Sequence, residues 1–149
     1  MSDSFKIMSE SLLFPSEEWV KEYCKRLCES PDYNKTGKGW KDPIKFKMVE
    51  LGALKDSIPY DSFILNLRDG KCEASEMVSD PTKGAPFELT ATYANWKKII
   101  DGKINPTQAM LTGQMKVKGN IALLLRYASA AIAMVKTAQS IPTRYVGEE

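Results

Sequence analysis

The sequence predicts an α+β protein, with one mainly antiparallel five-stranded sheet and helices over one face of that sheet. Two observations carry this prediction. Segments of alternating apolar and polar residues lie in the middle of the chain, and amphipathic or apolar helical segments flank them. The chain has 149 residues, of which 43% are apolar and 27% charged. It is therefore expected to form one domain over 1–149, with a loose N-terminal segment over 1–15.

The first helix is expected over 16–30. Ser16 offers an N-cap, and Glu17 and Glu18 complement the positive end of the helix dipole. The following stretch, 31–43, is rich in glycine, lysine and aspartate and is expected to be a loop. The apolar stripe of the helix consists of Trp19, Val20, Tyr23, Cys24 and Leu27.

The strands are expected to alternate between a buried face and a wet face. The dipeptide Asp69-Gly70 predicts a two-residue hairpin turn between two of them. The outward face should carry Lys45, Lys47, Glu88, Thr90, Thr92, Lys116 and Lys118. The five strand segments are 44–51, 62–68, 71–79, 87–93 and 114–118.

The densest local information lies in residues 101–120, which follow a helix expected over 94–101. Gly102 suits the left-handed residue after a helix, and Asn105 with Pro106 marks the start of the next helix. Gly113 should end that short helix. Gly119-Asn120 then turns the chain and caps a last helix that is apolar on nearly all sides.

Three short sequence segments resemble the sterol carrier protein type 2 family. They are Gly-Lys-Ile-Asn-Pro (102–106), Ala-Met (109–110) and Gly-Gln-Met-Lys-Val-Lys-Gly-Asn (113–120). The match is best over 87–140. The opening Phe-Pro-Ser-Glu-Glu-Trp (14–19) and the dipeptide Gly39-Trp40 resemble single-domain microbial members. The strand over 71–79 is more polar than in the animal proteins, which makes binding of some lipid a firmer expectation than binding of sterol.

The resemblance implies a curved sheet whose helices enclose an apolar tunnel for fatty acids, acyl-CoA or sterol-like ligands. It implies lipid binding and transfer, with no catalytic centre and no cofactor. Candidate polar groups at the tunnel mouth are Gln108 and Arg126, with Tyr127 and Arg144 as further choices. The expected tunnel lining is Phe46, Met48, Leu65, Phe87, Leu89, Trp96, Ile100, Met110, Met115, Val117, Leu124, Tyr127, Ala128, Ala131 and Val135.

The last helix gives an independent reason for a ligand. A helix on one face of a sheet needs an apolar stripe of only about 100°, yet residues 121–135 are apolar nearly all round. The apolar surface beyond this stripe must contact a ligand, another helix or a second subunit. The alternative function is therefore an interaction subunit or homodimer whose apolar C-terminal helix face is a protein interface.

Several classes of function are disfavoured. The chain has no histidine, which removes histidine-based nucleophilic catalysis and imidazole metal ligands. Its three cysteines, Cys24, Cys28 and Cys72, cannot complete a zinc site and are expected to be packing thiols in a reducing compartment. With a net charge of +2 and interspersed signs, nucleic acid is not an expected partner.

Membrane insertion is not expected either. We identify no signal peptide, no peroxisomal tripeptide and no apolar run long enough to span a bilayer, so a cytoplasmic location is expected, with transient membrane contact as an open choice. The five lysines within residues 35–47 could attract anionic lipid head groups or a coenzyme A tail, although a solvated surface is favoured. Trp40 should be anchored on the core, a lid over the pocket being the alternative. An isomerase would need a buried carboxylate such as Glu76 or Asp101.

Overall fold

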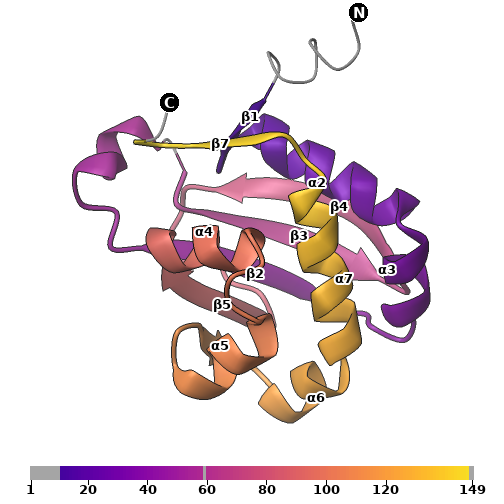
Figure 1. Cartoon of the computed structure of the whole chain (residues 1–149). Coiled ribbons are helices and arrows are strands. Elements are labelled where there is room, and N and C mark those ends of the chain that lie inside the picture. Colours follow the sequence, from indigo (N-terminus) through magenta and orange to yellow (C-terminus); the bar gives the residue numbers. More distant parts are fainter. Residues whose placement is uncertain (1–10, 59, 148–149) are drawn as a thin grey trace, which may run out of the picture.

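The structure is a computed structural model that describes residues 11–58 and 60–147 (Figure 1). Within these residues, three consecutive strands in the middle of the chain and three pairs of consecutive helices build a mainly antiparallel sheet with helices over one face, so the predicted α+β fold class is confirmed. The strands are β1 (Leu12–Phe14), β2 (Pro43–Val49), β3 (Ser62–Arg68), β4 (Lys71–Val78), β5 (Phe87–Thr92), β6 (Lys116–Lys118) and β7 (Thr143–Tyr145). The helices are α2 (Glu17–Glu29), α3 (Pro31–Thr36), the 3-10 helix η1 (Gly52–Ser57), α4 (Tyr93–Ile100), α5 (Pro106–Thr112), α6 (Ile121–Arg126) and α7 (Ala128–Gln139).

The main sheet has five strands in the order β4-β3-β2-β5-β6. Three of its four strand pairs are antiparallel. The fourth pair, between the central strand β2 and β5, is parallel, with Phe46 opposite Leu89. All five predicted strand segments are present, and the sheet is mainly antiparallel as expected, with one parallel pair that makes it mixed.

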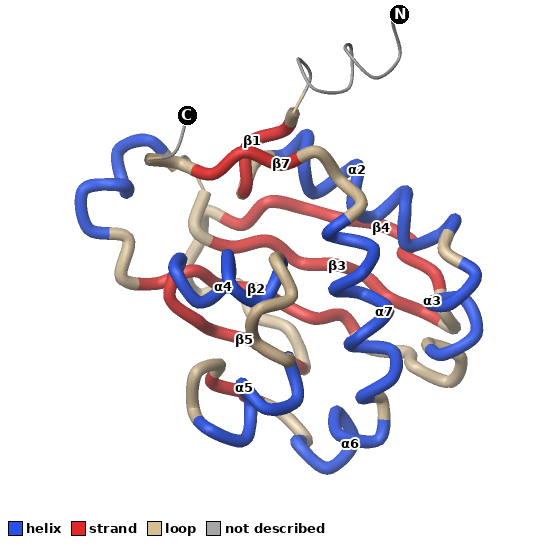
Figure 2. Tube along the Cα trace, in the orientation of Figure 1, coloured by secondary structure: helices blue, strands red, loops and turns tan. Residues whose placement is uncertain are grey.

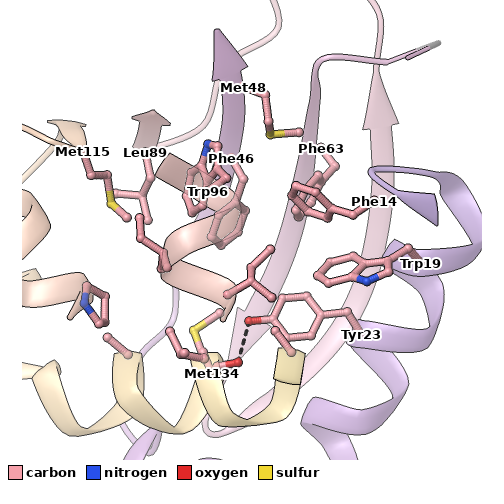
Figure 3. A pocket seen from close by; sticks show the side chains of 16 residues that line it. Phe14, Trp19, Tyr23, Phe46, Met48, Phe63, Leu89, Trp96, Met115 and Met134 are labelled. Carbon is pink, nitrogen blue, oxygen red and sulfur yellow. Dashed lines mark hydrogen bonds between the residues drawn. The ribbon is translucent and has the colours of Figure 1, made fainter. Parts of the chain in front are cut away.

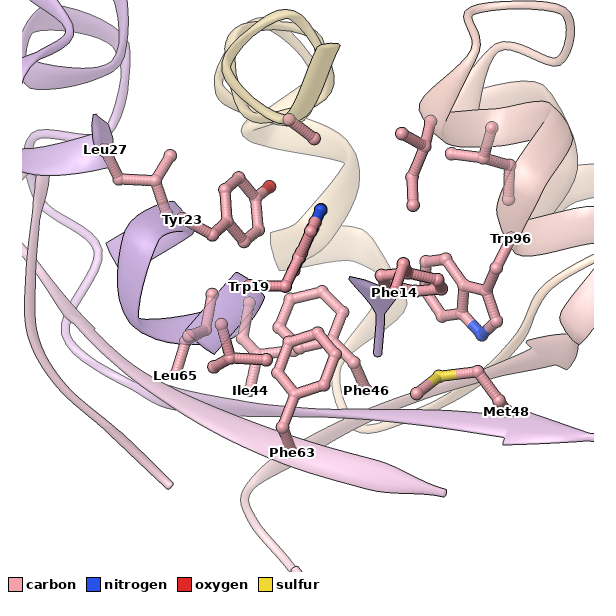
Figure 4. Close-up of a cluster of buried hydrophobic side chains, with 14 of the residues drawn as sticks. Phe14, Trp19, Tyr23, Leu27, Ile44, Phe46, Met48, Phe63, Leu65 and Trp96 are labelled. Carbon is pink, nitrogen blue, oxygen red and sulfur yellow. The ribbon is translucent and has the colours of Figure 1, made fainter. Parts of the chain in front are cut away.

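The helices form a layer over one face of the sheet (Figures 1 and 2). Helix α7 runs across the sheet, with α2 on one side of it and α4 and α5 on the other. Helix α2 packs on β4, and α7 contacts α2, α3, α4 and α5. The main core lies between the two layers, where aromatic and aliphatic side chains from both meet (Figure 4).

The predicted helix ends are confirmed at atomic detail. The Ser16 hydroxyl accepts the Trp19 N–H at 3.1 Å, and the Asn105 side chain accepts two N–H groups at the start of α5. Gly113 ends α5 in the left-handed conformation at φ 82°. The hairpin turn has positive φ at both Asp69 and Gly70, as a type I′ turn requires.

Two helix predictions are wrong. The expected loop over 31–43 begins with α3, because Ser30 caps a helix that has Pro31 at its first position and an acidic residue in its first turn. The last helix is also broken. Tyr127, at φ −103° and ψ 29°, separates α6 from α7, so the apolar segment turns once instead of continuing straight.

The predicted loose segment over 1–15 is wrong in its last residues, while 1–10 lie outside the described part of the chain. Leu12–Phe14 form β1, which pairs in parallel with β7. The Phe14 side chain is 2% exposed and packs on Trp19, Tyr93 and Tyr145. This small second sheet ties the two ends of the described chain together.

The outer face of the sheet is not uniformly wet, which corrects the prediction for Lys45. Its side chain is 2% exposed, and its ammonium group donates to the carbonyl oxygen of Lys83 at 2.7 Å. The connection from β4 to β5 must pass β3 and β2, and it covers this part of the sheet. Ile64, opposite Lys45 in the register, is buried there as well.

The cysteines also differ from the prediction. Cys24 of α2 and Cys72 of β4 form a disulfide, so two of the three are not packing thiols. Cys28 is free and donates from its thiol to the carbonyl oxygen of Cys72 at 3.0 Å. Cysteine usage therefore does not indicate a reducing compartment.

The disulfide should contribute substantially to stability. Because its cysteines are 48 residues apart, loop-closure entropy predicts that Cys72→Ser lowers the free energy of unfolding by about 4 kcal/mol. Urea unfolding under non-reducing conditions measures this loss. Cys28→Ser is the matched control, since it removes a thiol and keeps the bond. Equal unfolding midpoints for Cys72→Ser and wild type would contradict the prediction.

Candidate ligand-binding site

Two apolar cavities lie between the sheet and the helix layer, and we name them the first and the second cavity. The first has a volume of about 80 Å³ and the second of about 70 Å³. Six residues line both, so the cavities share a wall. These are Phe46, Leu89, Pro106, Met115, Ala131 and Met134.

The floor of the first cavity is the inner face of the sheet (Figure 3). Strand alternation points Phe46 and Met48 of β2, Phe63 of β3 and Leu89 of β5 to this face. The rings of Phe46 and Phe63 stack with centroids 5.0 Å apart. The same periodicity that builds the sheet therefore makes this wall apolar throughout.

Helices close the first cavity from the other side. Helix α7 contributes small or flexible side chains, Ala131, Met134 and Val135, which leave space above the sheet. Helix α4 contributes Trp96, whose indole N–H donates to the carbonyl oxygen of Lys47 at 2.8 Å and fixes the ring. The opposite end is closed by aromatic residues of β1 and α2, which are Phe14, Trp19 and Tyr23.

The polar atoms of these aromatic walls are already paired. The indole N–H of Trp19 donates to the hydroxyl of Thr143 at 2.9 Å. Burial raises the pKa of Tyr23 above its ordinary value, so its hydroxyl stays protonated and donates to the carbonyl oxygen of Met134 at 3.0 Å (Figure 3). The first cavity thus offers carbon surface and favours an uncharged, apolar guest.

The second cavity lies toward α3 and α6. Trp40, 5% exposed, forms part of its wall and packs on Phe87 and Tyr127, so the expected anchoring of Trp40 on the core is confirmed. Tyr33 and Tyr127 also line it. Neither hydroxyl has a hydrogen bond to a residue that the structure describes. The second cavity therefore differs from the first in having polar groups with free capacity.

The size of the cavities limits what they hold as they stand. One water molecule needs about 10–15 Å³ of such cavity volume. A methylene group is about as large as a water molecule. Each cavity then has room for roughly five to eight such groups, and the two together for roughly ten to fifteen. The flexible side chains of Met110, Met115 and Met134 line these cavities and can enlarge the space.

Eleven of the fifteen expected lining residues lie at these cavities, and four do not. Leu65 is fully buried in the core, Phe87 packs on Trp40, and Val117 and Ala128 are half-buried elsewhere. The eleven are Phe46, Met48, Leu89, Trp96, Ile100, Met110, Met115, Leu124, Tyr127, Ala131 and Val135.

The expected polar mouth is not assembled around the cavities. Gln108 and Arg126 are exposed, and neither lines a cavity. Arg144 donates to the carbonyl oxygen of Ser11 near β1. Tyr127, the remaining choice, does line the second cavity, and its hydroxyl lies close to Gly39, where a Cβ atom would be 2.6 Å from it.

Several lining residues were not expected from the sequence. Phe14, Trp19 and Tyr23 come from the N-terminal part of the chain, and Tyr33 and Trp40 from a stretch interpreted as loop. The stripe of α2 marks Trp19 and Tyr23 as buried, but a periodic stripe does not say whether a side chain meets protein or a cavity.

No acidic side chain lines either cavity among the described residues. Glu76 pairs with Lys83 at 2.6 Å on the outer side of the sheet, and Asp101 is exposed after α4. Within the described ranges no group of three acidic or cysteine side chains is placed to hold a metal ion. The lining of both cavities therefore offers mainly apolar binding surface.

A mixed sheet under a helix layer, with apolar cavities between them, defines a small α+β domain with an enclosed apolar site. A family model described as the SCP-2 sterol transfer family matches residues 20–131. The chain belongs to this family, which confirms the resemblance noted in its sequence.

Solved structures support the same assignment. A crystal structure of sterol carrier protein 2 has 30% identity and a TM-score of 0.76, covering 85% of this chain and 97% of the other. A conserved hypothetical protein from Thermus thermophilus has 28% identity and a TM-score of 0.74, covering 87% and 90%. A sterol carrier protein 2 of Aedes aegypti in complex with palmitate has 20% identity and a TM-score of 0.50, covering 78% and 94%, and shares the fold.

Curated relatives match over a shorter stretch. Hydroxysteroid dehydrogenase-like protein 2 of Homo sapiens is 34% identical over 47 residues, which is 32% of this chain and 11% of that protein. The chain therefore spans about a tenth of the length of the curated relatives it matches. In the described ranges, no helix combines the length and apolarity needed to cross a bilayer.

Proposed function

We propose that this protein is a non-catalytic carrier that binds and transfers a long-chain acyl lipid, with the two cavities joined into one tunnel when the ligand is bound. The observation that carries the proposal is their shared wall of six apolar residues, together with a first cavity whose polar atoms are already paired. The Aedes aegypti relative in complex with palmitate supports the acyl class.

The energetics of such a carrier need no specific polar contact. Burying a sixteen-carbon chain gains about 12 kcal/mol at about 0.8 kcal/mol per methylene, against an association cost of about 4–15 kcal/mol. Micromolar binding requires a net of about 8 kcal/mol. At the low end of that association cost the net gain is about 8 kcal/mol, so apolar burial alone reaches micromolar affinity when the site is largely preformed.

The polar end of the ligand is best placed in the second cavity. Tyr33 and Tyr127 line it, and burial raises the pKa of Tyr33 so that its hydroxyl stays protonated. A protonated hydroxyl can donate to a carboxylate or to a thioester carbonyl. The methyl end would then lie in the first cavity, against Phe14 and Trp19.

Tyr127→Phe tests this orientation. Removing one hydrogen bond to a charged group should weaken palmitate binding by about 1.5–3 kcal/mol, that is, about tenfold or more. The affinity for the methyl ester, which lacks the charge, should fall less. The affinities come from displacement of a fluorescent fatty-acid analogue. Equal losses for both ligands would place the carboxylate elsewhere.

The carrier proposal itself is tested by the same displacement assay with purified protein. We expect palmitate or palmitoyl-CoA to displace the probe at micromolar concentration, and native mass spectrometry to show one ligand per chain. Absence of probe binding, with palmitate, palmitoyl-CoA and a sterol all inactive, would reject it. No turnover of acyl-CoA is expected, because none of the acidic side chains that the structure describes lines the cavities.

A further inference from the structure

We propose that Cys24, Cys28 and Cys72 form a thiol-exchange site, at which a low-molecular-weight thiol reduces the Cys24–Cys72 disulfide by way of Cys28. We name these three residues the cysteine cluster. Cys24 and Cys28 lie one turn apart on α2, and Cys72 lies on β4, against which α2 packs (Figure 1). None of the three lines either cavity, so this site is separate from the ligand-binding site.

Hydrogen bonds place the free thiol against the main chain of a disulfide cysteine. The Cys28 thiol donates to the carbonyl oxygen of Cys72 at 3.0 Å, and the N–H of Cys72 donates in turn to Cys28 Sγ at 3.3 Å. Only the Cα and Cβ atoms of Cys72 separate that N–H group from its own sulfur. Rotation of the Cys28 side chain therefore brings the two sulfur atoms within reach of each other.

The neighbouring backbone holds Cys28 beside Cys72. The side-chain amide of Asn34 donates to the carbonyl oxygen of Cys28 at 3.2 Å and to that of Gly70 at 2.7 Å. Gly70 packs so closely on Asn34 that a Cβ atom there would lie 2.3 Å from the Asn34 carbonyl oxygen. The end of α2 is thus fixed to the hairpin turn before Cys72 by contacts that do not involve the disulfide.

The three cysteines differ in their access to solvent. Cys24 is 9% exposed and Cys72 5%, whereas Cys28 is half-buried. A thiol in solution therefore reaches Cys28 more easily than it reaches the disulfide. Direct attack on the buried disulfide requires the surrounding structure to open, and exchange with Cys28 avoids that opening.

The internal exchange is redox-neutral. The Cys28 thiolate attacks Cys72 Sγ, so the Cys28–Cys72 bond forms while the Cys24–Cys72 bond breaks. Cys24 leaves as a thiolate and takes up the proton that Cys28 lost. Attack on Cys24 is disfavoured, because residues one turn apart on a helix have Cβ atoms about 5–6 Å apart and a disulfide needs about 3.5–4.5 Å.

Reduction then takes place at the accessible sulfur. An external thiolate attacks Cys28 Sγ, forms a mixed disulfide with it and releases Cys72 as a thiolate. A second external thiolate attacks the external sulfur of the mixed disulfide and releases Cys28. The external thiols are thereby oxidised to their own disulfide, and the disulfide of the protein is reduced to thiols.

Reduction of the cysteine cluster loosens one wall of the first cavity. Helix α2 supplies Trp19 and Tyr23 to that wall, and Cys24 directly follows Tyr23 in the sequence. Without the disulfide, α2 loses its covalent attachment to β4 at this point. Ligand affinity therefore depends on the redox state of the cluster, a consequence that rests on the proposed carrier function.

The rate at which glutathione reduces the folded protein tests this route. We expect the disulfide of the wild type to be reduced at least about tenfold faster than that of Cys28→Ser, which has no neighbouring thiol. The matched control C28S/E29C returns a thiol one residue further on, because Glu29 is exposed and lines the groove between α2 and α7. It should be reduced as slowly as Cys28→Ser. Alkylation of the released thiols followed by mass spectrometry gives the rates.

Cys24→Ser provides a second test that does not depend on rates. This variant keeps Cys28 and Cys72, and oxidation with glutathione disulfide should join them. Peptide mass spectrometry of a digest made without reductant identifies the bond. The oxidised variant should also unfold at a higher urea concentration than its reduced form.

Three results would overturn the proposal. These are equal rates for the wild type and Cys28→Ser, a rate for C28S/E29C equal to that of the wild type, and a Cys24→Ser variant that keeps both thiols free after oxidation. None of these measurements uses a lipid, so they do not depend on the carrier function. If reduction requires Cys28 and neither redox form binds the fluorescent fatty acid, the exchange site stands and the carrier function fails; the converse result rejects the exchange site alone.

Discussion

Leu124→Arg should abolish ligand binding and lower the free energy of unfolding by several kcal/mol. Leu124 lies on α6, is 8% exposed and lines the second cavity. No described acidic side chain lines that cavity, so a guanidinium there would be buried without a counter-ion. Such a group costs several kcal/mol, comparable with the total stability of a small domain, which is about 5–15 kcal/mol.

Two further variants make this result interpretable. Ile121→Arg introduces the same charge one turn earlier on α6, where the side chain is 47% exposed, and should leave both stability and binding in solution unchanged. Leu124→Ala should cost about 2–3 kcal/mol, the low end of the usual range, because part of its surface faces a cavity. Thermal melting with and without palmitate measures both quantities. An unchanged melting temperature and full binding for Leu124→Arg would contradict the site.

The parts of the fold that sequence predicts well are those encoded within a few residues. Asn105 and Pro106 start α5 because a side-chain cap and a residue without an N–H satisfy the local backbone. Strand alternation correctly assigns Phe46 and Leu89 to the inner face, which is why the cavity floor was predictable. In both cases the residues that determine the local structure are close in sequence to the residues that they position.

The parts that could not be predicted depend on segments far apart in the chain. The disulfide between Cys24 and Cys72 joins residues 48 positions apart, and no spacing rule pairs two of three cysteines. Phe14 closes the first cavity only because β1 pairs with β7. Alternation also places Lys45 on the outer face, but it does not reveal the connection that covers this side chain.

The break at Tyr127 divides the last apolar segment into two helices. Residues 121–135 contain no glycine or proline, so their periodicity predicts one straight helix. The break instead turns α6 away from α7. Leu124 of α6, Tyr127 and Ala131 of α7 line the same cavity, and their spacing of i, i+3 and i+7 would place them on one face of an unbroken helix as well. The surplus apolar surface of this segment is thus divided between the cavities and the exposed side chains Ile121 and Ile132.

Ala131→Phe should abolish fatty-acid binding while leaving the protein folded. Ala131 of α7 lines both cavities, so a larger side chain at this position occupies the wall that they share. A phenyl ring takes the place of several methylene groups, and each group that can no longer be buried costs about 0.8 kcal/mol of binding. The affinity should therefore fall by at least a hundredfold, which is about 2.8 kcal/mol.

The stability of Ala131→Phe should change by less than its affinity. Overpacking costs about 1–3 kcal/mol in a filled core, but here part of the ring enters empty space and gains contacts that offset this cost. Ser129→Phe is the matched control, because Ser129 is exposed on the same helix two residues earlier. Titration with the fluorescent fatty acid and thermal melting of both variants give the comparison. If Ala131→Phe binds palmitate as well as Ser129→Phe does, the acyl chain does not pass this wall and the ligand does not span the two cavities.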